Sequence, residues 1–158
     1  MKTLIFFFGL FLFASCSNGS KKPATLTTVV DNIDTIKYQN GDTLYPFKNF
    51  DFSGRDWEAV IEIDKDDMMD LSVRVPKKNR LSTTEIEVLN KLKDWGFIYQ
   101  QSDMATVLNT LKLLCKGKTV VEYGIVLDIN SVGLQSSTYG WINSFDSSKI
   151  FETISFFK

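Results

Sequence analysis

The sequence predicts an α+β fold, in which a mostly antiparallel sheet carries two or three helices packed on one face. Several runs of residues alternate between apolar and polar side chains, as half-buried strands do, and two other stretches repeat apolar residues at helical spacing. These elements do not follow the regular strand–helix alternation of parallel sheets. The sequence also contains no glycine-rich phosphate loop and no dinucleotide fingerprint, which argues against a nucleotide-binding α/β fold.

The first predicted hairpin joins short strands at 35–38 and 43–45. Asn40-Gly41 lies between them, and this dipeptide is typical of tight hairpin turns. Three later strands are predicted at residues 97–100, 119–129 and 139–142. Gly124 interrupts one face of the longest of these strands, where we expect a β-bulge.

A second hairpin is predicted from strands at 57–64 and 71–75, which both alternate apolar with polar side chains. The residues between the two strands are mostly acidic, so this hairpin has an acidic tip. On its outward face we expect Glu58 and Glu62 to lie near Arg74, because opposite charges pair across neighbouring strands.

Two helices are predicted in the middle of the chain. The first begins at Ser82-Thr83-Thr84-Glu85, which has the pattern of a capping box, and it ends before Gly96. The second begins at Ser102 or Asp103 and ends before Gly117. In both segments the apolar residues fall on one stripe, which is typical of helices that pack against a core.

The C-terminal segment 150–157 fits either a helix or a strand. Its aromatic and β-branched residues suit a strand. We favour a helix, because Asp146-Ser147-Ser148 can cap one and Ile150, Ile154 and Phe157 would then share one side.

The composition excludes several classes of function. The chain has 158 residues, which suits one domain, with a formal net charge of −1 and a pI of about 5.5. It contains no histidine, so Ser-His dyads, Cys-His dyads and imidazole metal ligands cannot form. The near-neutral charge argues against a nucleic-acid partner. We therefore expect no cofactor and no metal.

The N-terminus has the features of an export signal. Lys2 precedes an unbroken apolar run, Leu4–Ala14, which is too short to cross a bilayer because spanning helices need about 20 residues. Phe13-Ala14-Ser15-Cys16 resembles the lipobox of bacterial lipoproteins, with Phe13 where Leu, Val or Ile is usual. The alternative is an ordinary secretory signal with an incidental cysteine.

The lipobox resemblance implies both the organisation and the location of the mature protein. Residues 1–15 would be removed as a signal peptide, and Cys16 would be acylated and hold the protein to the membrane. Residues 16–30 would then form a flexible tether to a single globular α+β domain at 31–158. Ser17 stands where inner-membrane lipoproteins usually carry Asp, so the resemblance implies the outer membrane. The absence of an acidic cluster after the cysteine favours the periplasmic face over the cell surface.

Four aspartates and two methionines at the tip of the second hairpin form the candidate partner-binding site. They are Asp64, Asp66, Asp67, Met68, Met69 and Asp70. The aspartates partly match a calcium loop, but Met69 replaces its glycine and Val75 replaces its bidentate glutamate. The tip is therefore either a solvated turn or a docking site for a basic partner, with the methionines adding apolar contact.

No residue is predicted to be catalytic. Cys115 has no histidine to activate it, and its place on the apolar stripe of the second helix is typical of a buried structural cysteine. The one Ser-x-x-Lys pattern ends at Lys158, the last residue of the sequence. Two carboxylates would suffice for glycoside hydrolysis, but no spacing singles out a pair among the 19 acidic residues.

Together these observations favour a small lipid-anchored, non-catalytic envelope protein that binds a protein partner near the membrane. A concrete form is an immunity or inhibitor lipoprotein that blocks a toxin or hydrolase arriving in the periplasm. Two alternatives stay open, an accessory subunit of an envelope complex and a small carbohydrate- or peptidoglycan-active enzyme that works through carboxylates.

Overall fold

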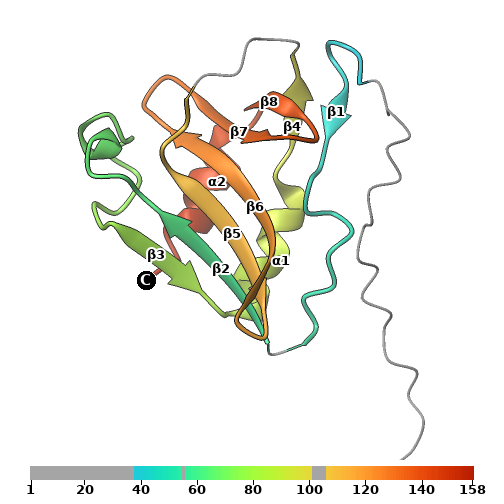
Figure 1. Ribbon diagram of the computed structural model, residues 1–158, viewed down its shortest axis with the longest axis vertical. Helices are drawn as coiled ribbons and strands as arrows, with labels where there is room; N and C mark the ends of the chain where they lie inside the picture. Colours follow the sequence, from blue (N-terminus) through green and yellow to red (C-terminus); the bar gives the residue numbers. More distant parts are fainter. Residues whose placement is uncertain (1–37, 55, 101–105) are drawn as a thin grey trace, which may run out of the picture. The chain divides into compact units, whose positions relative to one another are not determined.

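In the part of the chain that the structure describes, eight antiparallel strands form one sheet (Figure 1). The structure is a computed structural model that describes residues 38–54, 56–100 and 106–158. The strands are β1 (Thr43–Leu44), β2 (Trp57–Glu62), β3 (Arg80–Thr83), β4 (Phe97–Tyr99), β5 (Thr110–Cys115), β6 (Lys118–Leu127), β7 (Val132–Ser136) and β8 (Gly140–Ser144). Their order across the sheet is β1-β4-β8-β7-β6-β5-β2-β3.

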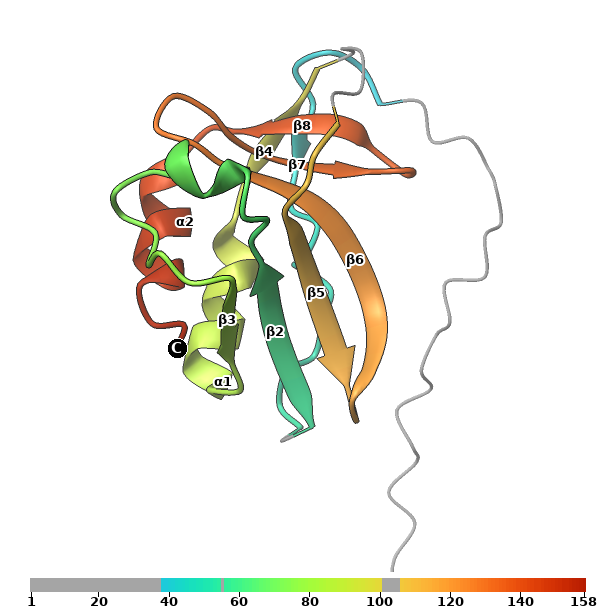
Figure 2. The ribbon, with the colours of Figure 1, turned by 60° about the vertical axis from the view of Figure 1, so that its left-hand side comes forward.

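Short helices accompany the sheet within the described ranges. They are the α-helices α1 (Ile86–Lys91) and α2 (Ser147–Ile154) and the 3-10 helices η1 (Asp67–Met69) and η2 (Leu92–Asp94). Figure 2 shows α1 and α2 on the same face of the sheet. The predicted α+β class, with two or three packed helices, is wrong, because the fold is dominated by its sheet. None of the described helices has the length and apolar character needed to cross a bilayer.

The described part of the second predicted helix is not helical, because residues 106–109 have no regular secondary structure and a strand follows them. Its expected start at Ser102 or Asp103 lies outside the described residues, and β5 occupies most of the rest. Leu111 and Leu113 are fully buried, while the residues beside them are only partly buried, as alternation in a strand requires. The spacing of the apolar residues fits both the roughly 3.6-residue repeat of a helix and the two-residue repeat of a strand. Pairing of β5 with β2 on one side and β6 on the other selects the strand.

The predicted capping box is also wrong. Ser82 and Thr83 belong to β3, and α1 begins only after Glu85, whose N–H donates to the Thr83 hydroxyl at 3.2 Å. The strand is favoured because it buries Leu81 and Thr83 against the core through pairing with β2. On its outer edge, Ser82 exchanges two backbone hydrogen bonds of 2.9 Å with Lys158.

The second predicted hairpin pairs with a different strand. β2 pairs with β3 and not with residues 71–75. In that range Leu71 makes only an isolated bridge with Asp128, and the N–H of Val75 closes a turn. Leu71 and Val75 are buried while the residue midway between them is exposed, so a turn fits the burial better than a pleated strand. We call residues 63–79 the β2–β3 connection.

The first predicted hairpin is correct at its turn and wrong in its pairing. Gly41 has a φ of +96°, a conformation that glycine adopts without strain, and the N–H of Asp42 donates to the Gln39 carbonyl at 3.0 Å. However, β1 pairs with β4 and not with the strand predicted at 35–38. Residues 35–37 of that strand lie outside the described residues.

The other predicted elements are confirmed, apart from one bulge. β2, β4, β6, β8 and α2 lie where alternation or capping predicted them. The bulge expected at Gly124 is instead a register shift between Leu113 and Leu114, where Val120 is the extra residue of β6. Gly124 has a packing role, because an added Cβ would lie 3.1 Å from the Cβ of Val107.

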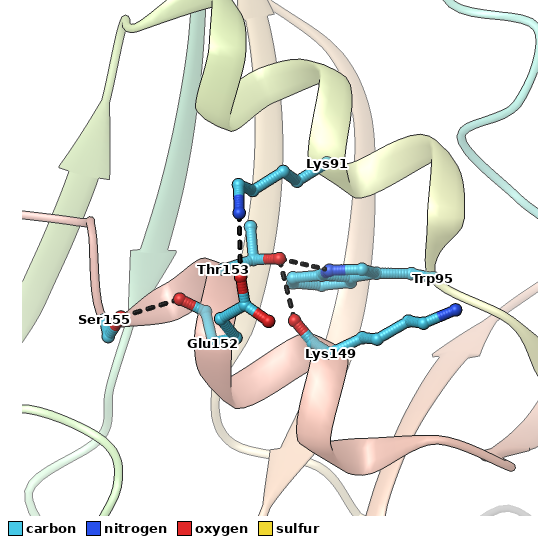
Figure 3. Close-up of polar contacts among 6 residues, drawn as sticks. All are labelled: Lys91, Trp95, Lys149, Glu152, Thr153 and Ser155. Atoms are coloured by element: carbon cyan, nitrogen blue, oxygen red, sulfur yellow. Dashed lines mark hydrogen bonds and ion pairs between the residues drawn. The ribbon is translucent and has the colours of Figure 1, made fainter.

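The core lies between the sheet and the two α-helices, and the described residues belong to one compact unit. Trp95 ties this core together, because its indole Nε1 donates to the Thr153 hydroxyl of α2 at 3.1 Å (Figure 3). Phe47 packs edge-on against Trp95 and Tyr123, with ring centroids 5.8 and 5.5 Å away. This packing fixes α2 beside the sheet, next to the β2–β3 connection.

Candidate functional site

The β2–β3 connection carries all six predicted binding residues beyond the C-terminal end of β2 (Figure 1). Asp67, Met68 and Met69 form η1, while Asp64 and Asp66 precede it and Asp70 follows it. Two short turns therefore hold these side chains close together. The arrangement is not the simple hairpin tip that the sequence predicted, because the return strand starts only at Arg80.

Asn109 anchors the acidic segment to the sheet. Its side-chain oxygen accepts the backbone N–H of Asp64 at 2.8 Å, and its side-chain nitrogen donates to the Asp67 carboxylate at 2.9 Å. Asn109 is only 1 % exposed, so its end of each bond is buried, while Asp64 itself is exposed. Sequence reasoning missed this residue. The available signal was an amide side chain inside an apolar run, since a buried amide must have hydrogen-bond partners.

A fifth carboxylate joins the aspartates from the loop after β6. Asp128 is bridged to Leu71 through the backbone, which places it beside Asp67 and Asp70. Partial burial, followed by the charges of Asp67 and Asp70, raises the pKa of the Asp128 carboxyl above its ordinary value. The sequence could not show this contact, because Asp128 lies far from the other aspartates along the chain.

Exposed apolar side chains lie close to these carboxylates along the chain. Met69 is 86 % exposed and Val73 is 87 % exposed, and Ile129, which follows Asp128, is 68 % exposed. Met68 differs, because it is half-buried and packs against the core. We call the following group the acidic–apolar surface: Asp64, Asp66, Asp67, Asp70, Asp128, Met69, Val73 and Ile129.

The described residues offer no metal centre at this surface or elsewhere. Among them, no group of three or more cysteine, aspartate or glutamate side chains is arranged to hold a metal ion. Within the surface, the carboxylate of Asp64 accepts the Asp66 N–H at 2.9 Å, and that of Asp67 accepts from Asn109. These two carboxylates therefore already have protein partners.

Two further expectations about charged residues need correction. Glu58 pairs with Arg80 at 3.0 Å and Glu62 with Lys112 at 2.6 Å, so neither pairs with Arg74. Lys112 also lowers the pKa of Glu62, first through its hydrogen bond. Both pairs lie at the surface, where an ion pair contributes little stability.

The two cysteines have different outcomes. Cys115 is the last residue of β5 and is half-buried, so it does not lie on a helix stripe as expected. Cys16, the predicted lipid-attachment residue, lies outside the described residues. Its acylation therefore stays a prediction from the sequence.

No protein-family model, curated protein or solved structure matches this chain. Function is therefore inferred from the residues and their geometry.

Proposed function

We propose that this protein is a small lipid-anchored, non-catalytic envelope protein that binds a basic protein partner through its acidic–apolar surface. One observation carries the proposal. Met69 and Val73 are highly exposed on a connection that carries four carboxylates and is anchored to the core, and the loop after β6 adds Asp128 and the exposed Ile129. A concrete form is an inhibitor or immunity protein that covers a toxin or hydrolase in the periplasm.

Each half of the surface has a separate physical role in binding. Burying exposed apolar side chains stabilises a complex by roughly 25 cal/mol per Å² of apolar surface removed from water. Methionine is unbranched and flexible, so Met69 can adapt to the shape of a partner. The carboxylates repel one another in the free protein and would attract lysine and arginine side chains of a partner, which speeds association and sets its orientation.

The predicted lipid anchor at Cys16 is the second part of the proposal. Acylation of Cys16 and a tether over 16–30 would keep the domain close to the outer membrane, on its periplasmic side. Replacing Cys16 by Ser removes the acylated thiol. We expect metabolic labelling with a fatty acid to mark the wild-type chain and not Cys16→Ser, and equal labelling of both would contradict the anchor.

Site-specific photo-crosslinking in intact cells tests the surface. A photoreactive amino acid at position 69 or 73 should give one discrete crosslinked protein. The same amino acid at Glu87 of α1 serves as the matched control, because Glu87 is exposed but does not belong to the acidic–apolar surface. Equal crosslinking from all three positions, or none from 69 and 73, would contradict binding through this surface.

The conditions under which the crosslink forms separate two versions of the proposal. An inhibitor or immunity protein should crosslink only when its toxin or hydrolase is present. An accessory subunit of an envelope complex should crosslink to the same protein in unchallenged cells.

A further inference from the structure

A shallow depression of about 360 Å³, which is open to solvent over most of its extent, lies between the β2–β3 connection and α2, and we call it the pocket. Its wall is formed by Arg74, Ser148, Phe151, Glu152 and Ser155. None of these residues belongs to the acidic–apolar surface. The pocket therefore represents a second feature of the molecule, and its ligand can be inferred from its own chemistry.

Arg74 supplies an available positive charge and hydrogen-bond donors. Among the residues that the structure describes, no carboxylate forms an ion pair with Arg74, and its side chain donates no hydrogen bond. Its guanidinium carbon lies 5.8 Å from the centroid of the Phe151 ring. A cation–π contact positions the guanidinium without using its N–H donors, which remain suited to a planar carboxylate.

Glu152 does not cancel this charge. Figure 3 shows its carboxylate bonded to the Lys91 ammonium of α1, and the two atoms are 2.8 Å apart. The negative charge of Glu152 therefore already has a partner outside the pocket. The unpaired charge in the pocket is that of Arg74.

The two serines present acceptors. The Ser148 hydroxyl donates its proton to the Asp146 carboxylate, and the Ser155 hydroxyl donates to the Glu152 carbonyl at 2.6 Å. Each hydroxyl has one proton, so both oxygens keep lone pairs that can accept a further hydrogen bond. The pocket therefore combines donors from Arg74, acceptors from the serines and the apolar side chain of Phe151.

We propose that this pocket binds a carboxylate that has a neighbouring N–H group, as found in the C-terminal residue of a peptide. The carboxylate would accept two parallel hydrogen bonds from Arg74, and the N–H would donate to a serine oxygen. The ligand's side chain would pack beside Phe151. This inference does not depend on the proposed partner surface, and either can fail without the other.

Three small probes test the proposal on the full chain in detergent micelles by NMR titration. N-acetylalanine carries both the carboxylate and the N–H, N-acetylalanine amide lacks the charge, and acetate lacks the N–H. We expect N-acetylalanine to bind with a Kd on the order of 1 mM, and each of the other probes to bind about tenfold more weakly. Saturable shifts should appear at the five pocket residues. Equal binding of the acid and the amide, or no saturable shift there, would overturn the proposal.

A matched pair of variants adds a second test. Arg74→Gln should weaken N-acetylalanine binding about tenfold or more, since it removes the charge and the paired donors. Lys149→Gln removes one positive charge from α2 outside the pocket wall and should leave binding unchanged. Wild-type affinity in Arg74→Gln would overturn the proposal. The probe comparison on the wild-type chain decides the question if Arg74→Gln does not fold.

Discussion

The β5–β6 turn and the β2–β3 connection each join two antiparallel neighbouring strands, but they differ greatly in length. Lys116 and Gly117 join β5 to β6 in a two-residue turn, with φ angles of +53° and +72°. The β2–β3 connection also joins antiparallel neighbours, but it uses residues 63–79. Two residues are enough to join such strands. The extra length of the β2–β3 connection is therefore not needed for the sheet, and it carries the acidic–apolar surface.

The connection is nevertheless firmly attached. Ile63, Leu71 and Val75 are buried in the core, whereas Met69 and Val73 between them are exposed. Buried residues at three places along the segment hold it against the sheet, so its exposed side chains have fixed positions. A segment ordered in this way loses less conformational freedom on binding than a mobile loop would.

The largest expected effect is at the buried apolar residues that hold the β2–β3 connection to the core. Leu71 is 2 % exposed, so Leu71→Ala should lower the free energy of unfolding by about 2–4 kcal/mol through lost burial and a cavity. Met69→Ala, two residues away, should change it by less than about 0.5 kcal/mol because its side chain is exposed. Urea unfolding of both variants measures the difference. Similar costs for the two would show that the connection is not divided into buried and exposed parts.

The second largest effect is expected at Asn109, whose side chain holds the acidic segment by hydrogen bonds. Asn109→Ala leaves the Asp64 N–H and the Asp67 carboxylate without their buried partner, which should cost about 1–3 kcal/mol. Asn90→Ala is the control, because that amide is exposed and bonds only within α1. Hydrogen exchange at the Asp64 amide should become faster in Asn109→Ala. An unchanged exchange rate would contradict the role of Asn109 in holding the acidic segment to the sheet.

The stability of the β5–β6 turn should depend on backbone conformation and not on burial. Gly117→Ala places a Cβ at a φ of +72° and should cost about 1–2 kcal/mol. Gly54 does not have a positive φ and an added Cβ would meet nothing within 4 Å, so Gly54→Ala should be neutral or slightly stabilising. Thermal unfolding compares the two, and an equal effect would contradict the left-handed turn.

The smallest effect is on the pH dependence of stability. The raised pKa of Asp128 means that its charged form is disfavoured in the folded state, so stability falls as the pH rises through that pKa. Asp128→Asn should therefore raise the free energy of unfolding at pH 7. The gain should disappear below the ordinary value of 3.8, where the wild-type carboxyl is protonated in both states. A gain that is the same at pH 7 and pH 3 would have another cause.

Local patterns predicted those elements whose burial is regular. β6 alternates along most of its length and α2 has a clear apolar side, so the sequence was sufficient there. β2 was also predicted, although Val60 is buried between Ala59 and Ile61 and interrupts its alternation. It failed between 102 and 117, where one apolar pattern fits two periods and only pairing on both sides decides. β7 was missed because Gly133 breaks its pattern. That glycine is explained by the neighbouring strand, because the Ile142 carbonyl oxygen and a ring atom of Trp141 each lie 2.6 Å from where a Cβ would be.

The candidate site was predictable only where it is continuous in sequence. The aspartates at 64, 66, 67 and 70 stand out as a cluster, and the structure places them together on one connection. Asn109 lies just before β5, and Asp128 and Ile129 lie just after β6, so no local pattern could associate them with the aspartates. The two adjacent methionines also looked equivalent in sequence, yet η1 turns Met68 towards the core and Met69 to the surface.

The association rate with the partner crosslinked at position 69 tests the central claim most directly. Asp66→Asn combined with Asp70→Asn removes two charges from the acidic–apolar surface, and Glu87→Gln combined with Asp94→Asn removes two exposed charges from α1 and η2. We expect the first pair to slow association roughly threefold to tenfold at low salt. High salt should erase the difference, because it screens exposed charges. The control pair should associate at the wild-type rate. An unchanged rate for Asp66→Asn/Asp70→Asn at low salt would contradict docking through this surface.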